Sequence, residues 1–99
     1  MNAPLDVSFD EYMQASLKDP QEAAAYIDAA MEMNDQAALL VALRDVAKAY
    51  GMADVARRAD VGDKTLFKAL SAKGNPTIAT VQKVLHAVGL RLSVTPEHA

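Results

Sequence analysis

Apolar residues recur along this chain at the spacing of helices. Between residues 36 and 50, and again between 78 and 88, they fall at three- and four-residue intervals that place side chains on one helix face. The first stripe is Leu39, Leu43, Val46 and Tyr50, and the second is Ile78, Val81, Leu85 and Val88. We predict a helix at each, with the second stripe buried. Gly51, in a left-handed conformation, should end the first helix, and Gly89 the second.

Two further helices are expected in the first third of the chain. Residues 9–17 carry apolar side chains four residues apart, namely Phe9, Met13 and Leu17. Asp19 followed by Pro20 is a strong helix start, because the Asp side chain accepts a hydrogen bond from a free amide and Pro has no amide hydrogen to lose. This helix should run to about residue 33, where Asn34-Asp35 breaks it.

The second half of the chain predicts two short helices over residues 52–59 and 63–71, separated by the sequence ADVG. The segment AKGNP is a polar turn, after which Thr77 can cap the last helix. The tail LRLSVT alternates apolar and polar residues, which predicts a short strand. A lone strand needs a neighbour, and a second copy of the chain could supply it. The expected fold is therefore all-α, with five to six helices and a short C-terminal strand.

The two short helices fit a helix-turn-helix, in which one helix braces a second whose first residues enter the major groove of DNA. The packing needs a small residue at the helix crossing and apolar anchors in the turn and the second helix, here Ala56, Val61, Leu66 and Leu70. The side chains left facing outward near the start of the second helix are Asp63, Lys64, Thr65 and Lys68. Candidates for nearby backbone contacts are Arg57, Arg58 and Lys73, with Asn75 bordering the following turn.

The net charge of −3 does not exclude DNA as a partner, because the charge is unevenly spread. Residues 1–43 contain eight acidic residues against Lys18 alone, a net charge of −7. Residues 44–73 contain seven basic and four acidic residues, a net charge of +3, and residues 74–99 carry +1. The second part can therefore bind DNA, while the acidic first part has another role, or none beyond solubility.

Other classes of function find no support in the residues. The 99 residues, 52% of them apolar, fit one domain. There is no cysteine, the two histidines His86 and His98 are far apart, and there is neither a Ser-His-Asp set nor a glycine-rich phosphate loop. The start MNAPLDVSFD has no basic flank or apolar run, and no stretch approaches the roughly 20 apolar residues of a membrane span. We expect a cytoplasmic binding protein with no metal, cofactor or catalytic residues.

The motifs of the chain resemble a known family. The segment from Gly51 to Val94 resembles the Cro/lambda-repressor type of helix-turn-helix. More narrowly, about residues 9–95 resemble the HigA-like addiction-module antidote family, which is encoded beside a RelE/ParE-like toxin. The matching motifs are GM at 51–52, LFKALS at 66–71, GNPT at 74–77 and GLRL at 89–92. The acidic first part matches at Phe9-Asp10, Asp19-Pro20, Ala25-Tyr26 and the run from Ala42 to Ala47.

This resemblance implies the antitoxin of a type II toxin-antitoxin pair, which neutralises its toxin by direct binding and represses its own operon. It implies that residues 9–50 form the candidate surface for the toxin or for dimerisation, and that residues 51–95 form the DNA-binding part. It further implies a homodimer on a palindromic operator. Two recognition helices would then lie about 34 Å apart, one turn of the duplex.

Three positions depart from the family pattern. Asp60 stands in place of a turn glycine, but Asp tolerates the left-handed conformation better than most residues. Ala53-Asp54 replaces a Gln or Thr at the start of the bracing helix, and Gly62-Asp63 replaces Ser-Arg at the head of the recognition helix. Asp63 can cap that helix, accept a hydrogen bond from a cytosine amine, or repel phosphate. Two alternatives therefore stay open: a stand-alone prophage-type transcriptional regulator, and a protein-interaction module whose helix-turn-helix has lost DNA binding.

Overall fold

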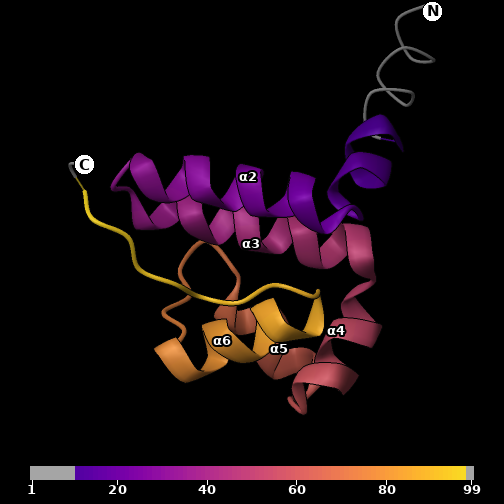
Figure 1. Cartoon of the computed structure of the whole chain (residues 1–99). Coiled ribbons are helices and arrows are strands. Elements are labelled where there is room, and N and C mark those ends of the chain that lie inside the picture. Colours follow the sequence, from indigo (N-terminus) through magenta and orange to yellow (C-terminus); the bar gives the residue numbers. More distant parts are fainter. Residues whose placement is uncertain (1–10, 98–99) are drawn as a thin grey trace, which may run out of the picture.

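The computed structural model describes residues 11–97, which form helices and the connections between them (Figure 1). A helical segment over residues 11–17 comes first. The helices that follow are α2 (Pro20–Glu32), α3 (Gln36–Tyr50), α4 (Met52–Ala59), α5 (Asp63–Ala69) and α6 (Ile78–Ala87). The expectation of an all-α fold is confirmed for the part of the chain described.

The helices form two layers (Figure 1). Helices α2 and α3 run antiparallel to one another and pack together as one layer. Helix α4 packs against α3, α5 and α6, and so joins the second layer to the first. Beyond α6 the tail runs back along the first layer, and residues 93–97 end beside the last turns of α2.

The core lies where α3 meets α4, α5 and α6. Its largest fully buried side chains are Leu43, Val46, Val55, Leu66, Leu70 and Val84. No polar or charged side chain is buried among residues 11–97. Burial of this apolar surface is the main term that stabilises so small a fold, and it places the apolar faces of α3, α4, α5 and α6 in one cluster.

Local sequence signals set most helix ends. The Asp19 carboxylate accepts a hydrogen bond from the Gln21 amide at 3.1 Å, with Pro20 at the first helical position of α2. Asp35 does the same for α3, accepting from the Ala37 amide at 3.0 Å. The Thr77 hydroxyl accepts from the Thr80 amide at 3.1 Å and caps α6. The predicted caps at Asp19 and Thr77 are confirmed, because these contacts depend only on residues close in sequence.

The predicted C-terminal strand is not present among the described residues. From Leu90 to Pro96 the backbone has no regular structure, and no backbone hydrogen bond joins residues 91–97 to the rest of the described chain. A strand requires a neighbouring strand for its hydrogen bonds, and residues 11–97 contain none. Helix α5 also ends at Ala69, not at Ser71 as predicted. The Ser71 hydroxyl donates to the Lys68 carbonyl at 2.8 Å, which ends the helix early.

Two details of the predicted helices are wrong. Ile78 was expected in the buried stripe of α6, but 69% of its surface is exposed, because α6 begins at this residue and its first turn lies at the surface. Gly51 has a positive φ of 116° as expected, but its ψ of 109° lies outside the left-handed helical region. Gly51 is both the C-cap of α3 and the N-cap of α4, so the chain must turn there within a single residue. Phe9 lies outside the described residues.

Candidate nucleic-acid interface

The connection between α4 and α5 is a tight turn built on a left-handed residue. Asp60 has φ 59° and ψ 47°, and its amide donates to the Arg57 carbonyl at 3.2 Å. The next amide, of Val61, donates to the Ala56 carbonyl at 3.0 Å while its side chain packs partly buried against the core. These two bonds satisfy the last carbonyls of α4 and fix the direction in which α5 leaves.

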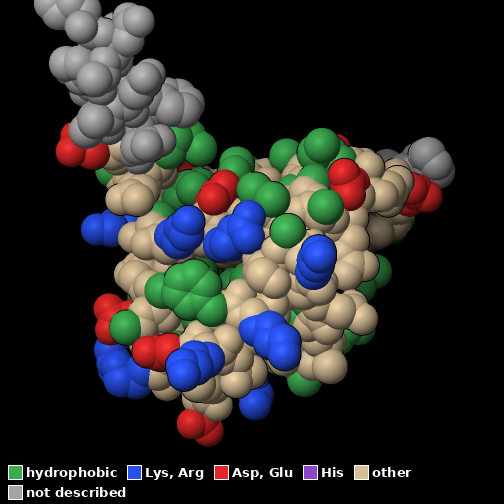
Figure 2. Space-filling model, turned by 180° about the vertical axis from the view of Figure 1, so that it is seen from behind, with side chains coloured by type: hydrophobic (Ala, Val, Ile, Leu, Met, Phe, Trp, Pro, Cys, Tyr) green, Lys and Arg blue, Asp and Glu red, His purple; other side chains and the backbone are tan. Residues whose placement is uncertain are grey.

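Helix α5 buries one face and exposes the other. Leu66 and Leu70 are completely buried, and Ala56 of α4 is 1% exposed, so the predicted anchors of the helix pair lie in the core. The opposite face carries the side chains predicted to contact DNA, and the exposed ones are Asp63, Lys64, Thr65 and Lys68. Figure 2, the view from behind, shows Lys and Arg side chains spread over one face of the molecule with hydrophobic surface among them.

Asp63 does not cap α5. The N-cap position is Gly62, and no side chain accepts a hydrogen bond from the first amides of the helix. The Asp63 carboxylate is exposed at the first helical position, where the positive end of the helix dipole stabilises it. Of the three roles that the sequence left open for Asp63, this geometry removes the capping role.

The two arginines of α4 are held by their own chain. Arg57 forms an exposed ion pair with Asp54, one turn earlier on the same helix. Arg58 donates a hydrogen bond to the Tyr50 hydroxyl at 2.9 Å, and its guanidinium carbon lies 5.3 Å from the centre of the Tyr50 ring. The Asp54 contact offsets part of the charge that Arg57 could offer to a phosphate, whereas Arg58 keeps its charge and gains a fixed orientation.

A hollow of about 390 Å³ lies beside the end of α5 and includes four of the predicted site residues. Its lining comprises Thr65, Lys68, Ala69, Ser71, Lys73, Gly74 and Asn75. Gly74 is required here by close packing, because a Cβ at this position would lie 2.1 Å from the Ala69 carbonyl oxygen. The GNP sequence therefore presses the turn against α5 and brings Lys73 and Asn75 to the same hollow as Thr65 and Lys68.

Two hydrogen bonds tie this region to α3. The Asn75 side-chain oxygen accepts from the Gln36 amide nitrogen at 3.3 Å, so Asn75 serves a structural contact as well as bordering the hollow. Arg44 donates to the Leu70 carbonyl at 3.3 Å, at the end of α5. The Arg44 contact was missed in the sequence, where the only signal was the charged pair Arg44-Asp45 within a mainly apolar run of α3.

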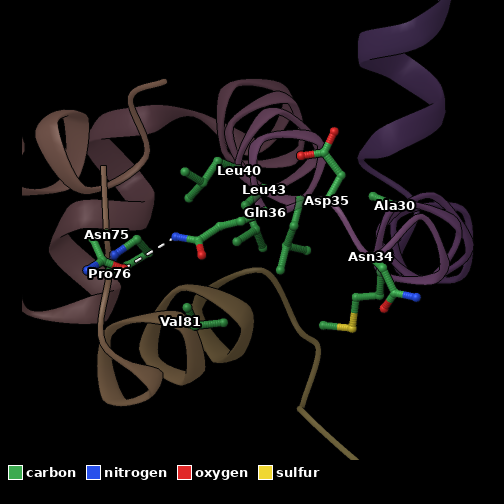
Figure 3. A pocket seen from close by; sticks show the side chains of 11 residues that line it. Ala30, Asn34, Asp35, Gln36, Leu40, Leu43, Asn75, Pro76 and Val81 are labelled. Atoms are coloured by element: carbon green, nitrogen blue, oxygen red, sulfur yellow. Dashed lines mark hydrogen bonds between the residues drawn. The ribbon is translucent and has the colours of Figure 1, made fainter. Parts of the chain in front are cut away.

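Gln36 and Asn75 also border a second hollow of about 450 Å³ (Figure 3). Figure 3 shows Gln36 reaching across from α3 to Asn75, with Leu40 and Leu43 of α3 above it and Val81 of α6 below. The walls therefore come from the α2–α3 connection on one side and from the turn before α6 on the other. This hollow lies between the acidic helices and the turn that follows α5.

An acidic and apolar groove runs between the end of α2 and the tail. Its volume is about 620 Å³, and the residues that line it include Asp28, Met31, Glu32, Val94 and Glu97. Apolar side chains at this end of the molecule are unusually open to solvent: Met33 is 64% exposed and Val94 is 96% exposed. Apolar surface rimmed by charge is typical of a surface that binds another protein.

Within the α2–α3 layer, the Tyr26 hydroxyl donates to the Asp45 carboxylate at 2.6 Å. This hydrogen bond, together with partial burial and the negative charge of Asp45, raises the pKa of Tyr26 from 10.0 to about 12. The pair links the two helices as long as Tyr26 keeps its proton and Asp45 is ionised. Its role is to hold the acidic layer together, and neither residue reaches the face of α5.

Comparison with known proteins identifies the family. The chain matches, over residues 7–96, the sequence model of a family described as probable addiction module antidote protein. It is also 38% identical over 78 residues to an uncharacterized protein of Haemophilus influenzae, a match that covers 79% of this chain and 80% of the relative. No solved structure matches the chain. The chain belongs to the family of probable addiction module antidotes.

Two further features are absent from residues 11–97, a membrane-spanning helix and a cluster of metal ligands. No helix within residues 11–97 is both long and apolar enough to cross a bilayer. No group of three or more His, Asp or Glu side chains in that range is arranged to hold a metal ion. Neither finding adds a site to the basic face of α5 and the acidic groove beside α2.

Proposed function

We propose that this protein is a HigA-like antitoxin that neutralises a RelE/ParE-like toxin by direct binding and represses its own operon through a Cro-type helix-turn-helix. Family membership carries the antitoxin part, since an addiction-module antidote acts on a toxin. The exposed basic face of α5 carries the DNA part. Both activities are binding activities, so the proposal includes no catalysis.

On this proposal α4 and α5 form the DNA-reading unit. Lys64 and Lys68 lie one turn apart on the exposed face of α5, where ammonium groups can reach phosphates and the edges of bases. Contacts to the DNA backbone are proposed for Arg58 and Lys73. Tyr50 orients Arg58, and Lys73 lines the hollow beside α5. Because these contacts displace counterions, affinity should fall with salt by about 0.9 log units per log unit for each phosphate contacted.

The toxin is proposed to bind at the acidic helices, and within them at the groove between α2 and the tail. The groove combines the exposed side chains of Met31 and Val94 with the carboxylates of Asp28 and Glu32. Apolar contact supplies affinity at such a surface, and the carboxylates favour a cationic partner. The toxin and DNA would then bind different faces of one antitoxin, as repression by the complex requires.

The protein is further proposed to act as a two-fold homodimer. Two copies of α5 about 34 Å apart would match successive turns of a palindromic operator. The tail from Leu90 to Thr95 is free of backbone hydrogen bonds beyond its first residue and could pair with its copy as a strand. Light scattering in solution tests the dimer, which should have twice the mass of the chain.

The first experiment is co-expression with the neighbouring small reading frame. Toxicity of the neighbour alone, together with rescue and co-purification by this protein, supports the antitoxin proposal. A harmless neighbour contradicts it and leaves the stand-alone regulator as the explanation. A gel shift on the protein's own promoter then decides whether α5 binds DNA, and a negative result for the protein and for its toxin complex favours the interaction module that has lost DNA binding.

Paired variants test the division between the two faces. The double variant Lys64→Ala and Lys68→Ala should abolish operator binding at physiological salt and leave neutralisation intact. The control is Lys48→Ala with Lys83→Ala, which removes the same charge from exposed positions on α3 and α6. The division of roles is wrong if the folded Lys64/Lys68 variant also fails to neutralise the toxin.

The reciprocal pair is Asp28→Asn with Glu32→Gln, which should weaken neutralisation and leave operator binding unchanged. Its control is Glu11→Gln with Glu22→Gln, two exposed carboxylates near the start of the acidic part. Equal losses from both pairs would mean that the toxin contacts a wider surface than the groove.

A further inference from the structure

Helix α5 exposes an aromatic ring on the face that carries its lysines. Phe67 is 55% exposed, although Leu66 before it is completely buried. Phe67 follows Lys64 by three residues and precedes Lys68 directly, so its ring neighbours the Lys64 side chain along the helix surface. None of the predicted DNA contacts included this residue, because its apolar character is equally typical of a core position.

A single exposed apolar side chain needs no explanation by itself. The position of Phe67 is what distinguishes it, because it lies one turn from Lys64 on the exposed face of α5. Asp63 also lies one turn away, and Lys68 is the next residue in the sequence. A surface that places phosphate-binding cations beside an apolar ring is complementary to a polyanion that also carries an apolar group. The phenyl ring has no hydrogen-bond donor or acceptor, so phosphate oxygens and polar base edges cannot be its target.

The major groove of DNA contains such a group. Thymine projects its C5 methyl group there, and Phe is among the side chains that make apolar contact with this methyl. We infer that Phe67 is a specificity-determining residue of α5 that selects thymine by contact with its methyl group. This inference rests on the proposed DNA-binding function and adds to it the base that one position of α5 reads.

The size of the effect follows from the area of one methyl group. Burial of one methyl or methylene group contributes about 0.8 kcal/mol, which is about a fourfold change in affinity. Removing the methyl from the contacted thymine should therefore weaken binding by about fourfold for each half-site. The loss should be the same at low and high salt, because no phosphate contact changes.

The experiment uses the full chain, alone and in complex with its toxin, and an operator located by footprinting on its own promoter. Each thymine of the operator is replaced in turn by deoxyuridine, which differs only in lacking the methyl, and affinity is measured by fluorescence anisotropy. One thymine per half-site should show the fourfold loss with the wild-type protein. Phe67→Ala should bind the thymine and deoxyuridine operators equally, with a salt dependence unchanged from wild type.

Two controls make the result specific. Val41→Ala removes an apolar side chain of similar exposure from α3, 41% against 55%, and should leave both affinity and the deoxyuridine response unchanged. Phe67→Leu keeps an apolar side chain and should retain part of the preference for thymine. A folded Phe67→Ala variant is expected, because the ring lies at the surface.

Three outcomes overturn the inference. If the wild-type protein binds its operator but no deoxyuridine substitution changes affinity by more than twofold, Phe67 does not read a methyl. If Phe67→Ala still loses affinity on deoxyuridine substitution, another residue contacts the thymine methyl group. If that variant loses only toxin neutralisation, the Phe67 ring contacts the toxin and not DNA. Absence of operator binding by the wild-type protein, alone and with toxin, removes the proposed DNA function itself and this inference with it.

Discussion

The two layers of this protein are built from similar amphipathic helices but present different chemistry to solvent. The outer surface of α2 carries Glu22, Asp28 and Glu32 and no basic residue, and it ends beside exposed methionines. The outer surface of α5 carries Lys64 and Lys68 with one exposed aromatic ring. Polar contacts differ as well: α2 and α3 are joined by a hydrogen bond between Tyr26 and Asp45, whereas α5 is held mainly by buried leucines.

This difference shows that the residues that stabilise the fold are distinct from the residues that determine what each surface can bind. The core is apolar and is shared by both layers, so it says little about partners. The surface charges are more informative about binding partners, because they can be exchanged without loss of the fold. Substitutions in the core and in each region test how far the stability and binding of the two regions are independent.

The largest expected effect comes from the shared core. Leu66→Ala removes a completely buried side chain and should lower the free energy of unfolding by about 3 kcal/mol. Tyr12 lies in the helical segment before α2, and Tyr26 and Tyr50 lie in α2 and α3. Tyrosine fluorescence therefore reports on the first 50 residues, while circular dichroism reports on every helix. In urea both signals should change together; separate midpoints would show that the regions unfold independently. Phe67→Ala, at the adjacent exposed position, should change stability by no more than about 0.5 kcal/mol.

The next effect should be confined to the basic region. Gly74→Ala introduces a Cβ that would lie 2.1 Å from the Ala69 carbonyl oxygen, so the turn must shift at a cost of about 2 kcal/mol. Operator binding should fall more than neutralisation, because the turn carries Lys73 and Asn75. Gly62→Ala is the matched control, since its Cβ would meet nothing closer than the Thr65 hydroxyl at 3.7 Å. Equal stability losses in the two variants would contradict this account of Gly74.

A smaller effect should be confined to the acidic region. The pKa of Tyr26 is raised to about 12, so the folded state favours the neutral phenol. This contribution to stability is complete below pH 10 and is lost as the pH rises toward 12. Tyr26→Phe should cost about 1 kcal/mol at neutral pH and should remove that part of the alkaline loss. The control is Tyr12→Phe, at a side chain 69% exposed, which should change neither the stability at neutral pH nor its loss in alkali. If Tyr26→Phe loses as much stability in alkali as the wild type does, Tyr26 is not the source of that loss.

The smallest effect concerns a surface ion pair. Asp54→Asn frees Arg57 from its carboxylate partner and should raise operator affinity by about twofold, with a change in stability of less than about 1 kcal/mol. Anisotropy at two salt concentrations measures both the gain and its electrostatic origin. Asp60→Asn removes the same charge from the turn and keeps a residue type that tolerates a left-handed backbone. An equal gain from both variants would indicate a general charge effect and not the release of Arg57.

The sequence predicted the helices well because their ends are determined locally. Asp19 and Pro20 start α2, and Gly51 separates α3 from α4, each through contacts within a few residues. The anchors Ala56, Leu66 and Leu70 were also identified, because a helix pair this short has few ways to bury apolar residues. The left-handed conformation of Asp60 was expected from the family resemblance, in which a glycine usually stands at this turn position.

What the sequence missed depends on residues far apart in the chain. The strand expected in the tail needs a neighbour, and the pattern LRLSVT does not show whether one exists. Ile78 fits its stripe by spacing, but its exposure depends on where the neighbouring helices end. The Arg44 contact spans 26 residues, and the exposure of Phe67 depends on the direction in which α5 packs. The site residues were predicted by chemistry, whereas their fixed partners Asp54, Tyr50 and Gln36 became visible only in three dimensions.

The burial of α3 has a consequence for how such a protein can diverge. Its side chains Leu40, Leu43 and Val46 are almost completely buried, and Arg44 reaches the end of α5. Substitutions at these buried positions of α3 therefore disturb both layers at once, and most will be removed by selection. The solvent-facing residues of α2, the tail and α5 are free of this constraint. The surfaces of the two layers can thus change by separate mutational routes, with the buried face of α3 inherited unchanged between them.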